Sequence, residues 1–473
     1  MDDMQNEGYH SSNPRRRQRT QMEVFKETYL PVVLAGIAVI LILIFIIGSI
    51  SRGIQKREME EQARKDALIA QQNEQKRLNE EAENLLIQAA VLAKDYDYES
   101  ALAILNTFSG NAEEFSVLQA AKQEYQAAKD SLVLWDDPSK VVNLSFQLLI
   151  ADPARAFTDR TYSSSFKKNF VTTGEFSSIL ESLYANNYIL VSLDDVYTTE
   201  ITESGSTIYV AKPLYLPAGK KPLLLTQTNV NYSLYLVDSN DDLKADKGGS
   251  GFAHRLVLNP DGSVSAEMVD SNGNTVVGDY DLVPILDKFI EQNPEFSYRG
   301  AKAILALTGY NGLFGYRTHA DAKQKLGETA YAEEVLGATA IANALRNNGY
   351  QLACYTYANV GYGSRSVAQI KSDLSGWTKE VTPILGDIDV LVFAQNSDIS
   401  AQGAYSGDKY NLLMDTGFRY FLGFCDTGKS WSLVSDNYVR QGRLLVGGAN
   451  IAQHTDWFSG MFDANVLDSA RNG

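Results

Sequence analysis

The side chains that most often perform catalysis are scarce in this sequence and widely spaced. There are two cysteines, Cys354 and Cys425, and four histidines, of which the closest pair, His254 and His319, are 65 positions apart. Because zinc sites usually combine closely spaced cysteine and histidine ligands, this spacing excludes a cysteine-based zinc cluster and a local histidine pair. No G-x-S-x-G string occurs either, so the nucleophile turn of an α/β-hydrolase serine esterase is absent.

One phosphate-binding string does occur, at residues 423–430, which satisfy G-x-x-x-x-G-K-S. A phosphate loop needs a helix directly after it, because the backbone N–H groups at the helix N-terminus hold the phosphate. The residues from Trp431 to Val434 are instead typical of an extended chain. We therefore interpret the string as a turn between two strands.

The overall composition is that of a folded, acidic protein. The 473 residues are 44% hydrophobic and 21% charged, which is typical of a globular chain with about three domains. The 42 Lys and Arg residues against 58 Asp and Glu residues give a formal net charge of −16. A nucleic-acid partner is excluded, because such proteins need a basic surface to neutralise phosphates.

Residues 29–50 are predicted to form a transmembrane helix. The run from Leu30 to Ile47 has no charged residue, and extended to Ile50 it is long enough to cross a hydrocarbon core of about 30 Å. A cleaved signal peptide is the alternative, although its apolar core would be shorter. Five basic residues flank the run on each side, so the positive-inside rule does not orient it. We expect a single-pass cell-membrane protein with a disordered cytoplasmic head at 1–28 and an extracytoplasmic C-terminal part.

Residues 51–88 are predicted to form a helical stalk. Leu78, Ala82, Leu85, Ala89 and Leu92 are spaced alternately by four and three positions, which is a heptad seam. Two interpretations stay open: a solvated stalk that holds the C-terminal part away from the membrane, and a coiled coil that joins two copies of the chain.

Residues 89–135 are predicted to form a small helical module. Small and large apolar residues around the turn at Tyr96 and Tyr98 resemble one tetratricopeptide-like helix pair, and a third helix with one apolar face follows. No 34-residue repetition occurs, which argues against a repeat array. A protein partner could bind within 55–135. The segment from Trp135 to Pro138 interrupts the helical period and marks a domain boundary.

From residue 139 to 473 the sequence alternates between strand and helix patterns. Strands are predicted at 141–150, 189–193, 222–225, 303–307, 352–357, 390–393 and 418–424, helices at 176–188, 282–292 and 330–348, and two short strands around the turn at 259–262. This alternation predicts an α/β barrel or open sheet whose ligands lie at the C-terminal ends of the strands. Cys354 is expected to be a buried strand cysteine.

From about Val141 to Gly447, roughly two thirds of the chain, the sequence resembles the polysaccharide deacetylase family (the NodB homology domain). The resemblance is carried, in the family's order, by LLIADPARAF (148–157), VTTGEFSSILESLYANNYILVSLDDVY (171–197), PLLLTQTNVNY (222–232), FSYRGAKAILALTGYNGLFGYRT (296–318), YSGDKYNLLMDTGFRYF (405–421) and DNYVRQGR (436–443). It implies a distorted (β/α) barrel that uses a divalent metal to deacetylate sugars such as cell-wall glycans.

The positions that carry catalysis in the family are altered in this chain. The family's first motif has two adjacent Asp residues, a general base and a metal ligand, where this chain has Thr228 and Asn229. Its second motif, H-T-x-x-H, supplies two imidazole ligands, where this chain has Tyr355 and Asn359. The stretch before Asp398 also departs from the family pattern. The resemblance therefore implies a deacetylase-type domain with no bound metal cofactor and no intact catalytic residue.

The chemical consequence of these changes is direct. Holding a divalent metal takes about three ligands of suitable charge and geometry, and the metal lowers the pKa of its bound water from 15.7 toward ~7. The neutral side chains of Asn229, Tyr355 and Asn359 are poor ligands, and the hydroxyl of Thr228 is not a base near neutral pH.

Three functions remain open from the sequence. The first is an inactive homologue, a pseudoenzyme, whose groove binds a cell-wall glycan or a protein partner. The groove candidates are Tyr232, Tyr310, Arg317, Tyr357 and Asp398, together with Tyr355 and Asn359. The second is an active metal-dependent deacetylase, hydrolysing the amide bond of N-acetylated sugars through a non-standard site. The third is a structural scaffold of the cell envelope that acts through its stalk and helical module.

Overall fold

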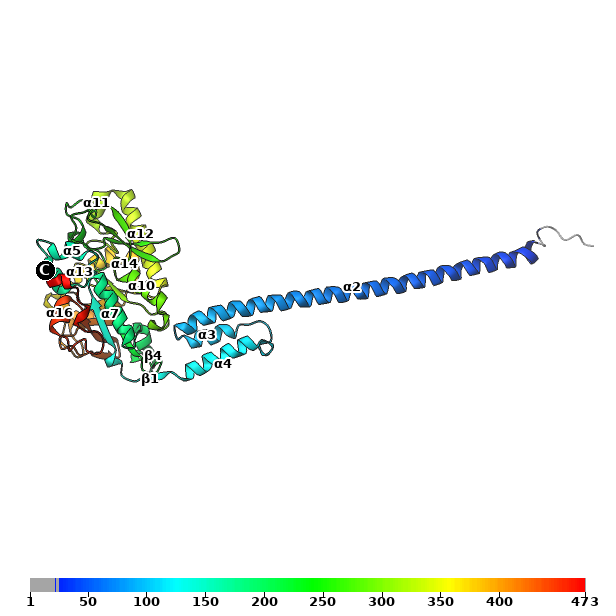
Figure 1. The fold of residues 1–473 in the computed structure, drawn as a ribbon, viewed down its shortest axis with the longest axis horizontal. Helices are drawn as coiled ribbons and strands as arrows, with labels where there is room; N and C mark the ends of the chain where they lie inside the picture. Colours follow the sequence, from blue (N-terminus) through cyan, green and yellow to red (C-terminus); the bar gives the residue numbers. More distant parts are fainter. Residues whose placement is uncertain (1–21, 23–24, 473) are drawn as a thin grey trace, which may run out of the picture. The chain divides into compact units, whose positions relative to one another are not determined.

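The structure is a computed structural model, and it describes residue 22 and residues 25–472. Most of the predicted cytoplasmic head, with its basic cluster and His10, lies outside these residues. The chain divides into two compact units, with the boundary between Glu83 and Asn84. The first unit contains a π-helical turn, η1 (Phe25–Tyr29), and most of the 65-residue helix α2 (Leu30–Lys94), shown in Figure 1.

Helix α2 combines an apolar first part with a charged second part. Its most apolar 18-residue window has a mean hydropathy of 3.3 and contains no buried residue. By length and composition, the helix is long and apolar enough to cross a membrane. Further along, pairs one turn apart such as Lys65 with Glu61 (2.8 Å) contribute a few tenths of a kcal/mol each to helix stability. The predicted apolar segment and the predicted stalk are therefore consecutive parts of one helix.

The second unit begins with the helical module. The last turns of α2 lie beside α3 (Tyr98–Leu105) and α4 (Ser116–Asp130), as Figure 1 shows. Ala89, Ala101, Leu105 and Leu118 have no exposed surface and form the centre of this packing. Because Ala89 is a seam residue, part of the predicted heptad seam packs within a single chain.

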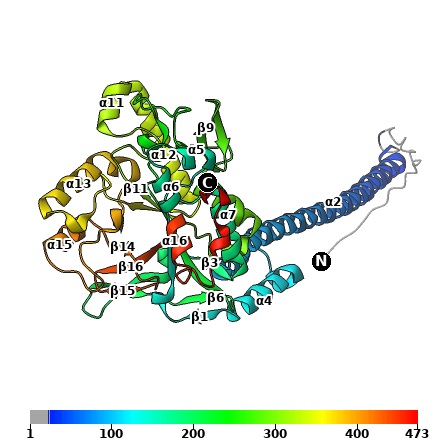
Figure 2. The ribbon, with the colours of Figure 1, turned by 60° about the vertical axis from the view of Figure 1, so that its left-hand side comes forward.

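The main body of the second unit is a closed barrel of seven parallel strands, seen together with its helices in Figure 2. In order around the barrel these are β2 (Val142–Phe146), β7 (Lys221–Thr228), β11 (Ile304–Leu307), β12 (Gln351–Cys354), β13 (Val390–Val392), β14 (Tyr420–Phe424) and β16 (Tyr438–Leu445). Pairing of β7 with β11 closes the ring. The predicted (β/α) barrel is confirmed at this level of architecture.

Helices and accessory strands surround this ring. The helices are α5 (Pro153–Thr158), α6 (Ser163–Asn169), α7 (Thr173–Ala185), α8 (Leu193–Val196), α9 (Leu234–Val237), α10 (Leu282–Gln292), α11 (Ala320–Leu326), α12 (Glu328–Asn347), α13 (Val367–Glu380), α14 (Thr382–Leu385), α15 (Asp408–Asp415) and α16 (Gly448–Gln453). The accessory strands are β1 (Val133–Trp135) paired with β6 (Leu214–Leu216), β4 (Tyr197–Ile201) with β5 (Thr207–Ala211), the meander β8 (Arg255–Leu258), β9 (Val264–Val269) and β10 (Thr275–Gly278), β3 (Tyr188–Leu190) beside β7, and β15 (Ser432–Ser435) beside β16.

The apolar residues form two separate layers. One cluster fills the inside of the barrel and includes Leu224, Ala306 and Leu422, whereas a larger cluster lies between the strands and the helices and includes Leu223, Leu305 and Phe421. Neighbouring residues of one strand belong to different clusters because side chains alternate along a strand.

A buried carboxylate joins three loops outside the barrel. Asp281 has no exposed surface, and its oxygens accept hydrogen bonds from Leu149 N (3.0 Å), Gln227 Nε2 (2.7 Å) and the Tyr232 hydroxyl (2.5 Å). Burial raises the pKa of Asp281, and these three donors oppose the rise. The carboxyl thereby fixes the chain segments that follow β2 and β7.

We expect Asp281→Ala to lower the free energy of unfolding by about 3 kcal/mol or more, because three buried donors lose their acceptor. Urea unfolding of the purified chain measures this. Asp279→Ala is the matched control, since Asp279 forms an exposed pair with Lys288 (2.8 Å) and its loss should cost less than about 0.5 kcal/mol. Equal effects of the two substitutions would contradict a special role for Asp281.

Candidate functional site

The inside of the barrel contains a connected row of polar side chains. Asn143 on β2 accepts a hydrogen bond from the Thr226 hydroxyl on β7 (2.8 Å) and donates to Gln441 Oε1 on β16 (3.3 Å). Gln441 Nε2 in turn donates to the carbonyl of Val141 (3.0 Å). These contacts cross from strand to strand, so β7, β2 and β16 are joined through side chains as well as through their backbones.

The guanidinium of Arg443, at the end of this row, is completely buried. It donates to Ser145 Oγ (2.7 Å) and to the carbonyls of Phe393 (3.2 Å) and Leu422 (3.3 Å), which are neutral acceptors. Burial lowers the pKa of Arg443 to about 10, while Tyr355 and Asp398 act in the opposite direction. The group therefore remains protonated at neutral pH, and the interior of the barrel carries a positive charge.

The four degenerate positions lie at or just after the C-terminal ends of β7 and β12, the two strands that flank β11. Thr228 is the last residue of β7, and Tyr355 directly follows β12. Both strands pair with β11, in parallel, so Thr228, Asn229 and Tyr355 lie at the same end of the barrel. Asn359 belongs to the turn after β12, and its carbonyl accepts a hydrogen bond from Gln395 Nε2 (2.8 Å).

The backbone at these strand ends adopts an uncommon conformation. Asn229, Thr356 and Asn359 have φ angles of 63°, 59° and 52°, in the left-handed region. Asparagine tolerates this region better than most residues, whereas a threonine there is strained. Such conformations are typical of loops that position side chains at a site. The side chains offered here are hydroxyl, amide and phenol groups.

Three of the predicted groove residues are buried, namely Tyr355, Tyr232 and Arg317. Tyr232 has no exposed surface, and its hydroxyl donates to Asp281. Arg317 is 4% exposed and donates through Nη1 to the carbonyls of Tyr232 and Asn311 (3.0 Å each). Tyr232 and Arg317 support the loops that follow β7 and β11.

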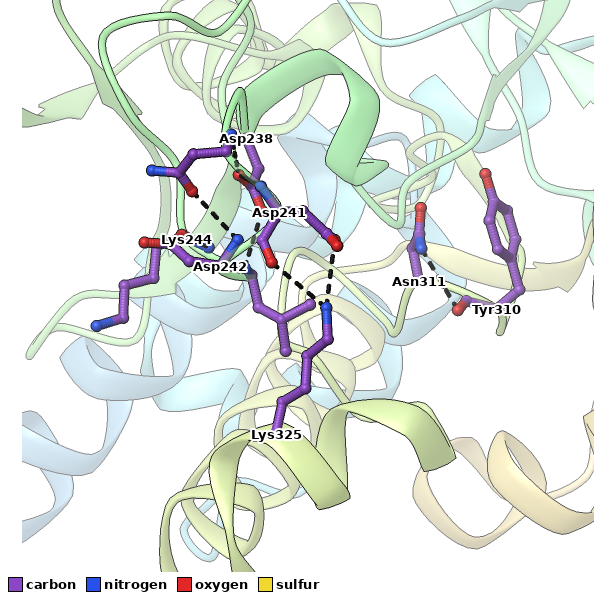
Figure 3. Close-up of polar contacts among 9 residues, drawn as sticks. Asp238, Asp241, Asp242, Lys244, Tyr310, Asn311 and Lys325 are labelled. Atoms are coloured by element: carbon purple, nitrogen blue, oxygen red, sulfur yellow. Dashed lines mark hydrogen bonds and ion pairs between the residues drawn. The ribbon is translucent and has the colours of Figure 1, made fainter.

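Tyr310 and Tyr357 occupy the loops after β11 and β12. The Tyr357 hydroxyl donates to Glu380 Oε2 (2.6 Å), whereas Tyr310 is 36% exposed. Figure 3 shows Tyr310 and Asn311 apart from the acidic loop around Asp238. Within that loop, Asp238 accepts backbone hydrogen bonds and Asp241 pairs with Lys325 (3.2 Å). The carboxylates of Asp238 and Asp241 are thus engaged in local contacts.

Among the predicted groove residues, Asp398 does line a groove. Its volume is about 830 Å³, and its walls come from the segments that follow β12, β13 and β14 and from the β15–β16 hairpin. The lining residues are Gly363, Ser364, Asn396, Ser397, Asp398, Ser400, Ala401, Gln402, Phe424, Asp426, Thr427, Trp431 and Arg440.

A buried ion pair forms one wall of this groove. Asp398 accepts hydrogen bonds from Arg440 Nη2 (2.9 Å) and the Tyr405 hydroxyl (2.6 Å). The side chain of Arg440 is 1% exposed, and its guanidinium lies 3.8 Å from the centre of the Tyr405 ring and 5.3 Å from that of Trp431. Burial and the Asp398 carboxylate both raise the pKa of Tyr405, so its phenol stays protonated.

Trp431 lies against a pair of glycines in neighbouring strands. Gly423 on β14 pairs with Gly442 on β16, and a Cβ atom on Gly442 would lie 2.2 Å from Trp431 Nε1. The glycines therefore make room for the indole. Trp431 Nε1 is buried and has no hydrogen-bond partner among the described residues, so a donor in this wall is unsatisfied.

Sequence reasoning did not identify Trp431 or Arg440 as site residues. The available signal was Gly423, inside the strand predicted at 418–424, because a strand glycine often marks a place where another group approaches closely. The partner of this glycine became visible only through the register of β14 against β16.

Two other expectations from the sequence are confirmed. Residues 423–430 form a strand end and a turn, and β15 follows where a phosphate loop would require a helix. Cys354 is fully buried at the end of β12, and burial raises its pKa well above the usual value.

No protein-family model and no curated protein matches this chain. Among solved structures, the chain is similar to the Streptococcus pyogenes deacetylase PplD in complex with acetate. The identity is 10%, the match covers 66% of this chain and 97% of that one, and the TM-score is 0.33. The barrel architecture is established by the strand pairings of this chain and does not depend on this similarity.

We expect Asp398→Ala to destabilise the fold by about 3 kcal/mol, because it leaves the buried Arg440 without its carboxylate. Asp426→Ala, an exposed position on the rim of the same groove, should change the free energy of unfolding by less than about 0.5 kcal/mol. Urea unfolding of both variants tests this. An Asp398→Ala protein as stable as the Asp426→Ala protein would show that the ion pair contributes little.

Proposed function

We propose that this chain is a membrane-anchored, extracytoplasmic protein of the cell envelope that binds glycan through a deacetylase-like barrel without metal-dependent hydrolysis. The observation that carries the proposal is the set of side chains at the strand ends. Thr228, Asn229, Tyr355 and Asn359 stand where the family resemblance implies the base and the metal ligands.

Electrostatics support the loss of metal chemistry. A dication is held by carboxylates or imidazoles, and the four positions offer neither. Inside the barrel, the buried guanidinium of Arg443 interacts electrostatically with Tyr355, one of the four positions. A cation next to a prospective metal site adds repulsion, which is strongest in a buried environment.

The groove beside the strand ends supports glycan binding. Sugars present many hydroxyl groups and apolar C–H faces, and an aromatic ring with hydrogen-bonding neighbours complements both. Trp431 provides a ring, while Asp398, Asn396 and Gln402 provide hydrogen-bond acceptors and donors. The buried pair of Asp398 and Arg440 holds its wall rigid, so little ordering is needed on binding.

Helix α2 supports the anchor. Its apolar first part has the length of a membrane span, and its charged second part continues as helix without interruption up to Lys94. Such a helix would anchor the chain that contains the barrel to a membrane.

We expect the purified chain to release no acetate from acetylated chitooligosaccharide, with or without added Zn²⁺ or Co²⁺, and to retain far less than one equivalent of either metal after dialysis. The physical reason is the absence of a charged or imidazole ligand at positions 229, 355 and 359. Elemental analysis and an acetate assay measure the two outcomes. The control is the variant T228D/N229D/Y355H/N359H, which should retain more metal, and chelator-sensitive acetate release by the natural chain would refute the proposal.

We expect the chain to bind a cell-wall glycan such as chitotetraose, and Trp431→Ala to weaken binding in the groove at least tenfold. A tenfold loss of affinity corresponds to about 1.4 kcal/mol of binding free energy, which is of the order expected for an aromatic ring in contact with a ligand. Titration calorimetry measures it. Trp457→Ala is the matched control, because Trp457 stacks on His454 (4.0 Å) outside the groove lining. Absence of binding to any wall polymer would defeat the proposal.

A further inference from the structure

A second cavity, of about 470 Å³, lies where the helical module meets the barrel. It is lined by Tyr96, Tyr98, Glu99, Lys129, Asp130, Leu132, Asp195, Lys212, Pro213, Leu214, Tyr215, Tyr298 and Arg299. The barrel residues among them precede strands: Leu214 and Tyr215 come before β7, and Tyr298 and Arg299 come before β11. The cavity is therefore at the N-terminal end of the barrel, opposite to the strand ends that hold Thr228 and Tyr355.

The two sides of this cavity are held together by few contacts. Strand β1, which follows the module, pairs with β6. Arg299 N donates to the carbonyl of Asp95 (2.7 Å), and the Arg299 side chain approaches Asp97 (3.7 Å) and Glu99 (3.8 Å). These contacts fix the module against the barrel, and the cavity is the space that remains between them.

Four tyrosines from separate parts of the chain converge on this cavity. Tyr96 and Tyr98 come from the module, Tyr215 from β6, and Tyr298 from the segment before β11. Tyr215 is 47% exposed, so its ring is accessible from solvent, whereas Tyr298 is buried. Burial raises the pKa of Tyr96 to about 12 and also raises that of Tyr298, which keeps both phenols protonated as donors.

The formal charges of the residues that line the cavity sum to zero. Three carboxylates, Glu99, Asp130 and Asp195, face three cations, Lys129, Lys212 and Arg299. The cavity consequently selects neither an anion nor a cation by its net charge. What it offers is aromatic surface together with hydrogen-bond donors and acceptors of both kinds.

We infer that this cavity is a second saccharide site, which takes an uncharged, hydroxyl-rich ring or a short run of such rings against the four tyrosines. A volume of about 470 Å³ is within the usual range of about 300–1,000 Å³ for small-ligand pockets. The ligand class rests on the proposed glycan binding, but the residues are all different from those of the groove at Trp431. Two sites at opposite ends of one barrel would engage a polymer bivalently, which raises its apparent affinity.

The test is titration calorimetry of the full chain, reconstituted in a lipid nanodisc free of sugar detergent, with chitotetraose as the probe. We expect two sites in the natural chain. Tyr98→Ala together with Tyr215→Ala should remove one site, and Trp431→Ala should remove the other. Tyr98→Phe keeps the ring and should weaken the cavity site less than Tyr98→Ala does. Melting temperatures check that each variant is folded.

The outcomes separate this inference from the proposed function. One site that disappears in Trp431→Ala and is unchanged in the double tyrosine variant would overturn the cavity site and leave the groove proposal standing. One site that disappears only in the double tyrosine variant would support the cavity site and reject the groove. No binding by the natural chain would reject both. A double tyrosine variant that does not fold is replaced by Tyr215→Ala alone, at the exposed tyrosine, which should still weaken the cavity site at least tenfold.

Discussion

The barrel depends on a polar contact made where most barrels have apolar side chains. The charged guanidinium of Arg443 has no exposed surface, and it donates hydrogen bonds to the Ser145 hydroxyl and to two backbone carbonyls. Removing such a group from water costs several kcal/mol, and only satisfied hydrogen bonds offset that cost. The three acceptors come from β2, β14 and the end of β13, so the strands must close around Arg443 in one register for the fold to form.

This requirement fits the proposal that ligands bind beside the barrel and not at its centre. Asn143, Gln441 and Thr226 use their hydrogen-bonding groups on one another, and Arg443 uses its own on the strands. Satisfied polar networks of this kind rigidify a core and leave no group free for a substrate. The groove, by contrast, is lined by Trp431, Asn396 and Gln402, and at the module junction several phenols line open space.

Much of the fold could be predicted from the sequence, because most elements have the hydrophobic period of their structure. The helix predicted at 282–292 has those bounds in the structure, and the strands at 303–307 and 390–393 differ from β11 and β13 by one residue. Strand β16 is not among the predicted strands, because YVRQGRLL contains two arginines and a glutamine. The residues that obscured the pattern are those that form the polar interior and the groove wall, so local sequence rules fail where tertiary contacts satisfy the polar groups.

The candidate site was predictable only where a family motif identifies a position. Thr228, Asn229 and Tyr355 lie at one end of the barrel, because β7 and β12 both pair with β11, and a barrel was implied by the resemblance. Trp431 and Arg440 had no such marker, since their role depends on the pairing of Gly423 with Gly442 and on a loop that brings Asp398 across from β13. A strand glycine in a single sequence indicates that some group approaches closely, but it does not identify that group, which only the folded structure shows. The tyrosines at the module junction could not be grouped from the sequence either. They are separated by up to 202 positions and line one cavity in the folded chain, in which β1 pairs with β6.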